Sequence, residues 1–252
     1  MEPAAWPGPA NREEPLRITL THPFDLSPSE AREVQRLLRA QVEEGPPLRP
    51  ERARLALGTD VSYLRADRLA LAAAVCCNVP ALSAVEQRVS EGPLVFPYVP
   101  GLLSFRELPA LIPALRALDC EPDVTVVDGQ GVAHPYGIGL ASHLGLMTGL
   151  PTIGCAKSVL VGEHTEPGPV RGDWTPLMYL GRRVGAALRT RTGVKPVFVS
   201  VGHRIDLESA IEIILALARG YRLPEPQRLA HLACEQLKRA HSPKGSGPLL
   251  AS

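Results

Sequence analysis

The chain has 252 residues, of which 45% are apolar, enough to fill the core of one sizeable domain. Its formal net charge is only +1, so overall charge gives no sign of nucleic-acid binding, and a nucleic-acid enzyme would need a local basic patch. The five cysteines form no Cys-x-x-Cys pair, which argues against a disulfide framework or a zinc site and indicates a reducing compartment.

The domain organisation is expected to be simple. A disordered N-terminus, rich in Pro, Ala and Glu, covers residues 1–15, a single folded domain covers 16–240, and a flexible tail covers 241–252. No signal peptide is evident, and the longest apolar run, Leu69–Cys77, is far shorter than the ~20 residues of a membrane span. We therefore expect a soluble, cytoplasmic protein that does not contact membranes, and a monomer.

The first predicted elements are a helix and three strands. Ser27-Pro28-Ser29-Glu30 is typical of a capping box with proline at the first helical position, and apolar residues at helical spacing follow it. Gly45-Pro46-Pro47 ends this helix. Short turn-rich links, one at Ala66-Asp67, join the strand candidates and predict an antiparallel meander. These strands span Leu55–Tyr63, Arg68–Cys77 and Leu82–Val89.

Helix and strand patterns alternate in the second half of the chain. Leu108–Leu118 is helical in pattern, and Pro109 and Pro113 predict an irregular start to this helix. Strands first, followed by alternating helices and strands, predict an α/β sandwich with a central mixed sheet and flanking helices. The later helices span Leu140–Met147, Leu207–Ala218 and Pro226–Ala240, and the later strands span Val124–Val127, Thr152–Cys155, Leu177–Leu180, Val184–Leu188 and Val197–Val201.

The segment from Val124 to Lys157 predicts a functional edge of the sheet. The β-branched run Val124–Val127 indicates a buried strand that stops at Asp128-Gly129, and ligands of open α/β sheets bind at such strand ends. A glycine-rich stretch follows, in which backbone can approach a ligand closely. A helix and a second strand then lead to Lys157. Strand, helix and strand thus bring an acid and a base to one edge.

Each candidate acid also has a structural interpretation. Asp60 lies inside a predicted strand, where it either faces solvent or needs a buried partner. Ser104-Phe105-Arg106-Glu107 fits a capping box, in which Glu107 would only bond the helix start. Asp128 could begin an Asp-Gly turn, and Asp206 is better explained as a helix cap than as a metal ligand. Lys157 alone would be a solvated surface lysine.

At these residues the chain resembles the endonuclease V family of inosine-directed nucleases. The resemblance covers roughly Arg52 to Leu232, and its motifs occur in the family's order. It implies an RNase H-like fold. The matching motifs are Gly58-Thr59-Asp60-Val61-Ser62-Tyr63, Pro97-Tyr98-Val99-Pro100-Gly101, Ser104-Phe105-Arg106-Glu107, Val126-Val127-Asp128-Gly129, Ala133-His134-Pro135, Gly139-Leu140-Ala141-Ser142-His143, Pro151-Thr152-Ile153-Gly154, Ala156-Lys157 and Ser200-Val201-Gly202-His203-Arg204.

The resemblance implies a metal site and catalytic residues. In the family the positions of Asp60, Glu107 and Asp128 are acidic metal ligands. Oxygen ligands select hard cations, so Mg²⁺ is expected and Mn²⁺ could replace it. Lys157 would neutralise charge on the phosphoryl group, and His134 would contact the phosphate or position water.

The resemblance also implies how the substrate is held. Gly129, Gly139 and Ala156 would leave room for a flipped purine, with backbone amides bonding its O6. Pro97-Tyr98-Val99-Pro100 would be an aromatic wedge that fills the gap in the strand. His203-Arg204, between a strand and a helix, has a geometry suited to anions. A basic run that could follow the phosphate backbone comprises Arg182, Arg183, Arg189, Arg191 and Lys195.

Two departures from the family pattern weaken the expected phosphate contacts. Tyr136 follows the His-Pro pair where relatives often have a basic residue, and Ser158 follows Lys157 where they often have a second lysine.

The predicted activity is that of a Mg²⁺-dependent DNA-repair endonuclease acting on deoxyinosine. It would hydrolyse the second phosphodiester bond on the 3′ side of hypoxanthine and leave 3′-hydroxyl and 5′-phosphate ends. One alternative is the same chemistry on inosine-containing RNA. Another is a non-catalytic nucleic-acid-binding protein of the same fold, against which the full set of acids argues.

Overall fold

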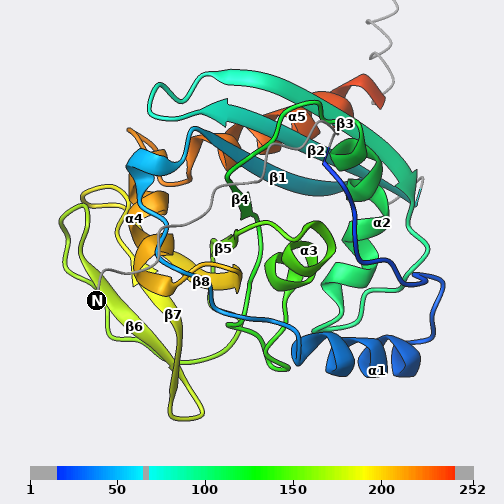
Figure 1. Cartoon of the computed structure of the whole chain (residues 1–252), viewed down its shortest axis with the longest axis horizontal. Coiled ribbons are helices and arrows are strands. Elements are labelled where there is room, and N and C mark those ends of the chain that lie inside the picture. The colour runs from blue at the N-terminus through cyan, green and yellow to red at the C-terminus, as the bar shows by residue number, and fades with distance from the viewer. Residues whose placement is uncertain (1–15, 65–67, 242–252) are drawn as a thin grey trace, which may run out of the picture.

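A computed structural model describes residues 16–64 and 68–241 and consists of one eight-stranded sheet with helices on both faces (Figure 1). The strands lie in the order β3-β2-β1-β4-β5-β8-β7-β6. Their bounds are β1 Leu55–Leu64, β2 Leu69–Asn78, β3 Ala84–Pro93, β4 Val124–Val127, β5 Thr152–Ala156, β6 Trp174–Tyr179, β7 Arg182–Leu188 and β8 Val197–His203. This is the predicted α/β fold with a central mixed sheet.

The first three strands form the predicted antiparallel meander. Strand β2 is buried along nearly all of its length, because α2 covers one of its faces and α5 the other. Strand β3 lies at the edge of the sheet, and its polar residues alternate between exposed and partly covered positions. An edge strand with this many polar and charged side chains discourages pairing with another chain.

The centre of the sheet is parallel and is built as the sequence predicts. Strand β4 pairs in parallel with β1 on one side and with β5 on the other. Helix α3, Leu140–Thr148, connects β4 to β5 and ends at Gly149, whose φ of +69° suits glycine. The strands β1, β4 and β5 therefore end at one edge of the sheet, where Asp128 and Lys157 follow β4 and β5.

The helices form two layers around the sheet (Figure 1). Helices α2 and α3 pack on one face, whereas α4 and α5 pack on the other. Helix α1 begins with the predicted capping box and packs beside the start of α2. The bounds are α1 Pro28–Arg39, α2 Leu103–Arg116, α4 Leu207–Leu217 and α5 Glu225–His241, with a short 3-10 turn, η1, at Pro50–Arg52.

Helix α2 corrects one prediction, because it begins at Leu103 and not at Leu108. Pro109 and Pro113 lie inside the helix, although each proline removes a backbone donor. Its buried face, which includes Phe105, outweighs that cost by packing against the sheet and α3. The prolines therefore do not mark the helix start.

Some predictions fall outside the described residues, namely the disordered N-terminus, the turn at Ala66-Asp67 and the tail after His241. His241 itself is the last residue of α5. The five cysteines all lie in the described part of the chain and are free thiols. None of the helices in the described ranges is long and apolar enough to span a membrane.

Gly58 in β1 tests how closely α5 packs on the sheet. A Cβ at this position would lie 2.1 Å from the backbone carbonyl carbon of Pro226, so α5 would have to move. We expect Gly58→Ala to lower the free energy of unfolding by about 1–3 kcal/mol, the range for overpacked cores. Urea unfolding followed by circular dichroism measures this change.

The matched control is Gly92→Ala in β3, where the added Cβ would meet Ala110 at an ordinary 3.7 Å. This variant should unfold within ~0.5 kcal/mol of the wild type. Equal losses in both variants would show that the effect comes from glycine in a strand and not from the contact with α5.

Candidate active site at the ends of β1, β4 and β5

Asp60 lies in β1 just beyond the last residue that pairs with β4. Its side chain is 7% exposed and points toward α5, where His231 Nδ1 donates a hydrogen bond of 3.0 Å to Oδ2. Burial and the nearby charge of Asp128 raise the pKa of Asp60 to about 6, although His231 opposes the shift. The alternative that Asp60 faces solvent is therefore wrong.

Asp128 directly follows β4, and its Oδ2 forms an ion pair with Lys157 Nζ. Lys157 follows β5, so the parallel pairing of the two strands brings the acid and the base together as predicted. Burial alone would lower the pKa of Lys157, but the contacts with Asp128 outweigh it and the net shift is upward. Lys157 is thus held as a cation facing the carboxylates.

Glu107 lies in α2 and is almost fully buried. The hydroxyl of Tyr63, from β1, donates a short hydrogen bond to its Oε1. Burial raises the pKa of Glu107 to about 8, the Tyr63 hydrogen bond opposes the rise, and the charges of Asp60 and Asp128 add to it. The capping-box interpretation is wrong, because no side chain caps α2 and Ser104 instead bonds His143 Nδ1.

Three carboxylates from three elements thus influence each other electrostatically at one edge of the sheet. Each has its own partner, Asp60 with His231, Glu107 with Tyr63 and Asp128 with Lys157. Within the described ranges, no group of three or more His, Cys, Asp or Glu side chains is already arranged around a metal position. The donor set is nevertheless one that fits a hard divalent cation, because it consists of carboxylate oxygens.

His231 is the site residue that the sequence analysis missed. It lies on α5 four residues after Gln227, whose side chain donates to Cys155 O in β5. Three residues further on, the thiol of Cys234 lies 3.4 Å from Asp60 O. Residues spaced by three and four share one face of a helix, so the polar stripe at 227, 231 and 234 faces the sheet. The spacing of Gln227, His231 and Cys234 along one face of the last helix was the sequence signal that could have identified His231 as a site residue.

A cavity of about 360 Å³ opens beside Asp128 and Lys157. Two helices, α2 and α3, begin at its wall, and neither start has a side-chain cap. The first backbone N–H groups of a helix have no partner within the helix and can bond a ligand, although that of Ala141 already donates to Gln130 O at 3.0 Å. The cavity brings together most of the residues predicted to bind the substrate, namely Tyr98, Val99, Pro100, Gly129, Gly139 and Ala156, with His134 beside them.

Side chains of α1 hold the loop that carries Tyr98 by hydrogen bonds to its backbone. Arg32 Nη2 donates to Pro100 O at 2.8 Å, and Gln35 Nε2 donates to Gly101 O at the same distance. Pro97, at the start of this loop, lines a separate cavity on its other side. The Tyr98 side chain is 72% exposed, so an anchored loop presents a free aromatic ring beside the cavity.

The predicted histidines have different positions. His134 is buried at the cavity, and burial, followed by the charge of Arg32, lowers its pKa to about 4, so the ring is neutral near pH 7. His203 and Arg204 lie elsewhere, because β8 is antiparallel to β5 and His203 pairs with Thr152, at the start of β5. That end is roughly 16 Å along the strand from Lys157 at ~3.3 Å per residue.

His203 and Arg204, predicted to bind the substrate, therefore lie at the opposite end of β5 from Lys157, and their role stays a prediction. Arg204 instead donates to Gly149 O at 3.0 Å and lies 3.6 Å from the carboxylate of Glu43. The sequence pattern correctly ends a strand there, but it does not reveal the direction of that strand.

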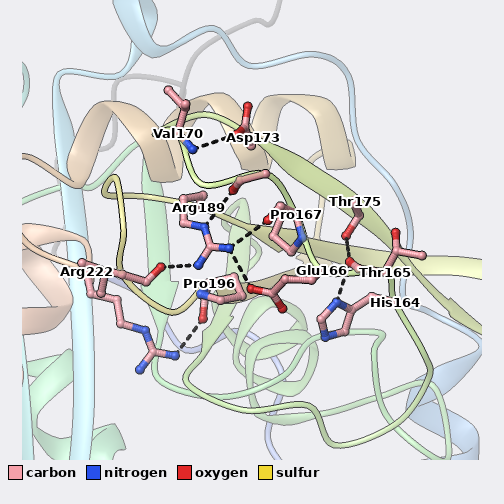
Figure 2. A network of polar contacts seen from close by, with 12 residues as sticks. His164, Thr165, Glu166, Pro167, Val170, Asp173, Thr175, Arg189, Pro196 and Arg222 are labelled. Carbon is pink, nitrogen blue, oxygen red and sulfur yellow. Dashed lines mark hydrogen bonds and ion pairs between the residues drawn. The ribbon is translucent and has the colours of Figure 1, made fainter.

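Arg189 is the one member of the predicted basic run that the structure removes from contact with a phosphate backbone (Figure 2). Its guanidinium is buried and donates to the backbone oxygens of Gly168, Pro167 and Val194, which pins the loop before β6. Arg222 makes a comparable contact, since Nη2 donates to Lys157 O and to Pro196 O, both at 2.7 Å. Arginine thus fixes the backbone that carries Lys157. Asp206 caps α4, as its structural interpretation predicts.

A mixed sheet of this order, with acids at the ends of its central strands and helices on both faces, is the RNase H-like nuclease fold. The solved endonuclease V of Streptomyces avermitilis is 46% identical, with a TM-score of 0.83 over 90% of this chain and 100% of that one. A family model described as Endonuclease V matches residues 36–232, so this chain belongs to the endonuclease V family. It is therefore an endonuclease of DNA repair.

Two further relatives extend the comparison. The endonuclease V of Roseiflexus castenholzii is 49% identical over 221 residues, which cover 88% of this chain and 98% of the relative. The endonuclease V of Ciona intestinalis is 28% identical with a TM-score of 0.74, covers 84% of this chain and 98% of its own, and was solved in complex with DNA containing an inosine followed by a ribo-adenosine.

The raised pKa values of Asp60 and Glu107 predict a pH-dependent stability in chelator-treated protein. Because folding favours their protonated forms, this stabilisation is complete below the ordinary carboxyl range and is lost as the pH rises through about 6 for Asp60 and about 8 for Glu107. We expect the free energy of unfolding to fall by more than ~1 kcal/mol between about pH 5 and about pH 9.

Urea unfolding at a series of pH values measures this fall. Glu107→Gln keeps the shape of the side chain but cannot ionise, so it should remove most of the slope above about pH 6. An unchanged slope in this variant would show that Glu107 is not the group that titrates.

Proposed function

We propose that this protein is a Mg²⁺-dependent endonuclease that recognises hypoxanthine and hydrolyses the second phosphodiester bond on its 3′ side, leaving 3′-hydroxyl and 5′-phosphate ends. The observation that carries the proposal is the gathering of Asp60, Glu107 and Asp128 at one edge of the sheet, where Asp128 also lines a cavity of about 360 Å³. A base can be enclosed in such a cavity only after it leaves the stack.

The three carboxylates would hold the cation, for which Mn²⁺ could substitute. When bound, the cation would supply Lewis-acid stabilisation of the phosphoryl group and activation of water. Because Asp60 and Glu107 have raised pKa values, they must give up protons on binding, and the cation affinity should increase with pH. His231 and Tyr63 orient the two buried acids throughout.

Lys157 and His134 would act on the substrate from the rim of the cavity. Lys157 is a cation within reach of the phosphate that the carboxylates would hold, and it would stabilise negative charge in the transition state. His134 is neutral and buried, so it would position the strand or a water molecule by hydrogen bonding and not by charge.

The cavity suits a planar base that carries an oxygen acceptor. A Cβ at Gly139 would lie 2.3 Å from Gln130 O, and one at Gly129 would lie 3.3 Å from Leu140, so side chains there would disturb the wall. Backbone N–H groups at the uncapped starts of α2 and α3 would donate to O6 of hypoxanthine, whereas adenine has a donor amine at that position. Ala156 adds a small apolar contact.

The nature of the strand is the finer question. DNA that contains deoxyinosine is the proposed substrate, because the anchored Tyr98 loop is suited to opening a duplex. RNA that contains inosine is the second candidate. The Ciona intestinalis relative binds an inosine that is followed by a ribonucleotide, so a 2′-hydroxyl is accommodated next to the lesion in that protein.

The metal assignment is tested by replacing one acid at a time. Asp60→Asn and Asp128→Asn should reduce cleavage of a deoxyinosine strand at least ~10³-fold, because each removes a ligand and a charge. Added Mg²⁺ should raise the melting temperature of the wild type, as binding to the folded state requires, but not that of either variant.

Asp119→Asn, at an exposed position, serves as the control and should behave as wild type in both measurements. The same gel compares matched deoxyinosine and ribo-inosine strands with Mg²⁺ and with chelator. Near-normal cleavage by Asp60→Asn or Asp128→Asn, or cleavage in chelator, would overturn the metal site. Much faster cleavage of the ribo-inosine strand would favour the RNA substrate.

The wedge role of Tyr98 predicts a difference between double and single strands. Stacking on an aromatic ring is worth ~1–3 kcal/mol per base, and ~1.4 kcal/mol corresponds to a tenfold change. Tyr98→Ala should therefore weaken binding and cleavage of an inosine duplex by about 10- to 100-fold, with a smaller effect on a single strand.

Tyr98→Phe keeps the ring and should retain most of the duplex activity, and neither variant should change the metal requirement. Binding by fluorescence anisotropy and cleavage on gels measure the two effects. Equal losses on both kinds of strand would show that Tyr98 serves folding or general contact.

A further inference from the structure

A second cavity, of about 470 Å³, lies across the Tyr98 loop from the cavity described above. Tyr98 and Leu103 line both cavities, so this loop is the partition between them. The acids are divided in the same way, because Asp128 lines the first cavity and Glu107 lines the second. A strand that crosses the carboxylates from the first cavity would therefore enter the second.

The walls of the second cavity combine flat, apolar and cationic side chains. The Arg106 guanidinium lies 5.1 Å from the centre of the Tyr63 ring, and its Nη1 is fixed by donating to Phe96 O at 2.6 Å. Val95 is 60% exposed and Tyr98 is 72% exposed beside them. Aromatic and guanidinium faces of this kind are where unpaired bases stack.

Arg68 adds a second cationic residue to the lining of this cavity. Its side chain lines the cavity and makes no hydrogen bond or ion pair within the described part of the chain. Two arginines, Arg68 and Arg106, thus line the cavity, and among the described residues Glu107 is its only acidic lining residue. The cavity volume falls within the range of about 300–1,000 Å³ that is usual for small-molecule sites.

We infer that this second cavity binds the nucleotide that follows the scissile phosphate, with its base against the Tyr63, Arg106 and Val95 wall and Arg68 over its exposed side. The inference rests on the proposed function, which puts hypoxanthine in the first cavity and the cut on its 3′ side. The strand then runs from Asp128 to Glu107 and leaves through the second cavity. The enzyme grips its substrate on both sides of the bond that it breaks.

The experiment couples a change in the enzyme to a change in the substrate. Deoxyinosine strands carry either a normal nucleotide or an abasic residue directly after the cut bond, and cleavage is measured with wild type, Arg68→Ala and the control Arg116→Ala. Arg116 is an exposed arginine in the last turn of α2, outside both cavities. Steady-state kinetics give kcat and KM for each pair.

With wild type, the abasic residue should raise KM about tenfold with little change in kcat, as expected for the loss of one stacked base. On the normal strand, Arg68→Ala should also raise KM about tenfold relative to wild type. On the abasic strand, the KM of Arg68→Ala should exceed that of wild type by less than about twofold, because the two changes remove the same contact. Arg116→Ala should match wild type on both strands.

Two results would overturn the inference. One is that the abasic residue leaves the KM of wild type unchanged. The other is that Arg68→Ala raises KM by the same factor on the abasic strand as on the normal strand. Either result counts against the inference only if wild type cuts the normal deoxyinosine strand at the expected bond. Absence of that cut would instead refute the proposed function, so the two failures are distinguishable.

Discussion

The burial of acids close to one another, to which their mutual repulsion adds, is the constraint on which this structure depends. Like charges in a poorly solvated place favour protonation, and the raised pKa values of Asp60 and Glu107 record that cost. Three side chains from different places in the chain stabilise the acids. They are the phenol of Tyr63 in β1, the ammonium of Lys157 after β5 and the imidazole of His231 in α5. None of these partners lies on the same element as the others.

The strand order explains why these groups meet. Strands β1, β4 and β5 are adjacent and parallel, so their carboxyl ends share one edge, and β1 continues past β4 to present Asp60 toward α5. The rim of the site has a different origin. It is formed by loops that are held by contacts from outside the sheet, such as Arg32 on Pro100 O and Arg222 on Lys157 O. The sheet edge and the loops around it are thus fixed by separate sets of contacts.

Local patterns predicted those parts of the site that are encoded by neighbouring residues. The Val124–Lys157 unit was predictable because a β-branched run, a glycine-rich stretch and a proline each mark a boundary. The environment of Glu107 was not predictable in this way. The Ser-x-x-Glu spacing is that of a capping box, but the helix already begins at Leu103, so Ser104 and Glu107 lie inside it. The distance of His203 and Arg204 from Lys157 was not predictable for a related reason, as a pattern gives the end of a strand but not its direction in the sheet. The family resemblance supplied the joint assignment of the acids, which no single motif could.

The hydrogen bond between His231 and Asp60 joins residues that are 171 positions apart. On the ribosome, β1 and its acid emerge long before α5, and the sheet edge lacks its imidazole until nearly all of the domain has left the exit tunnel. Without that donor the pKa of Asp60 would be higher still, and the acid would stay protonated more readily. The site at the ends of β1, β4 and β5 is therefore complete only when α5 has packed on the sheet.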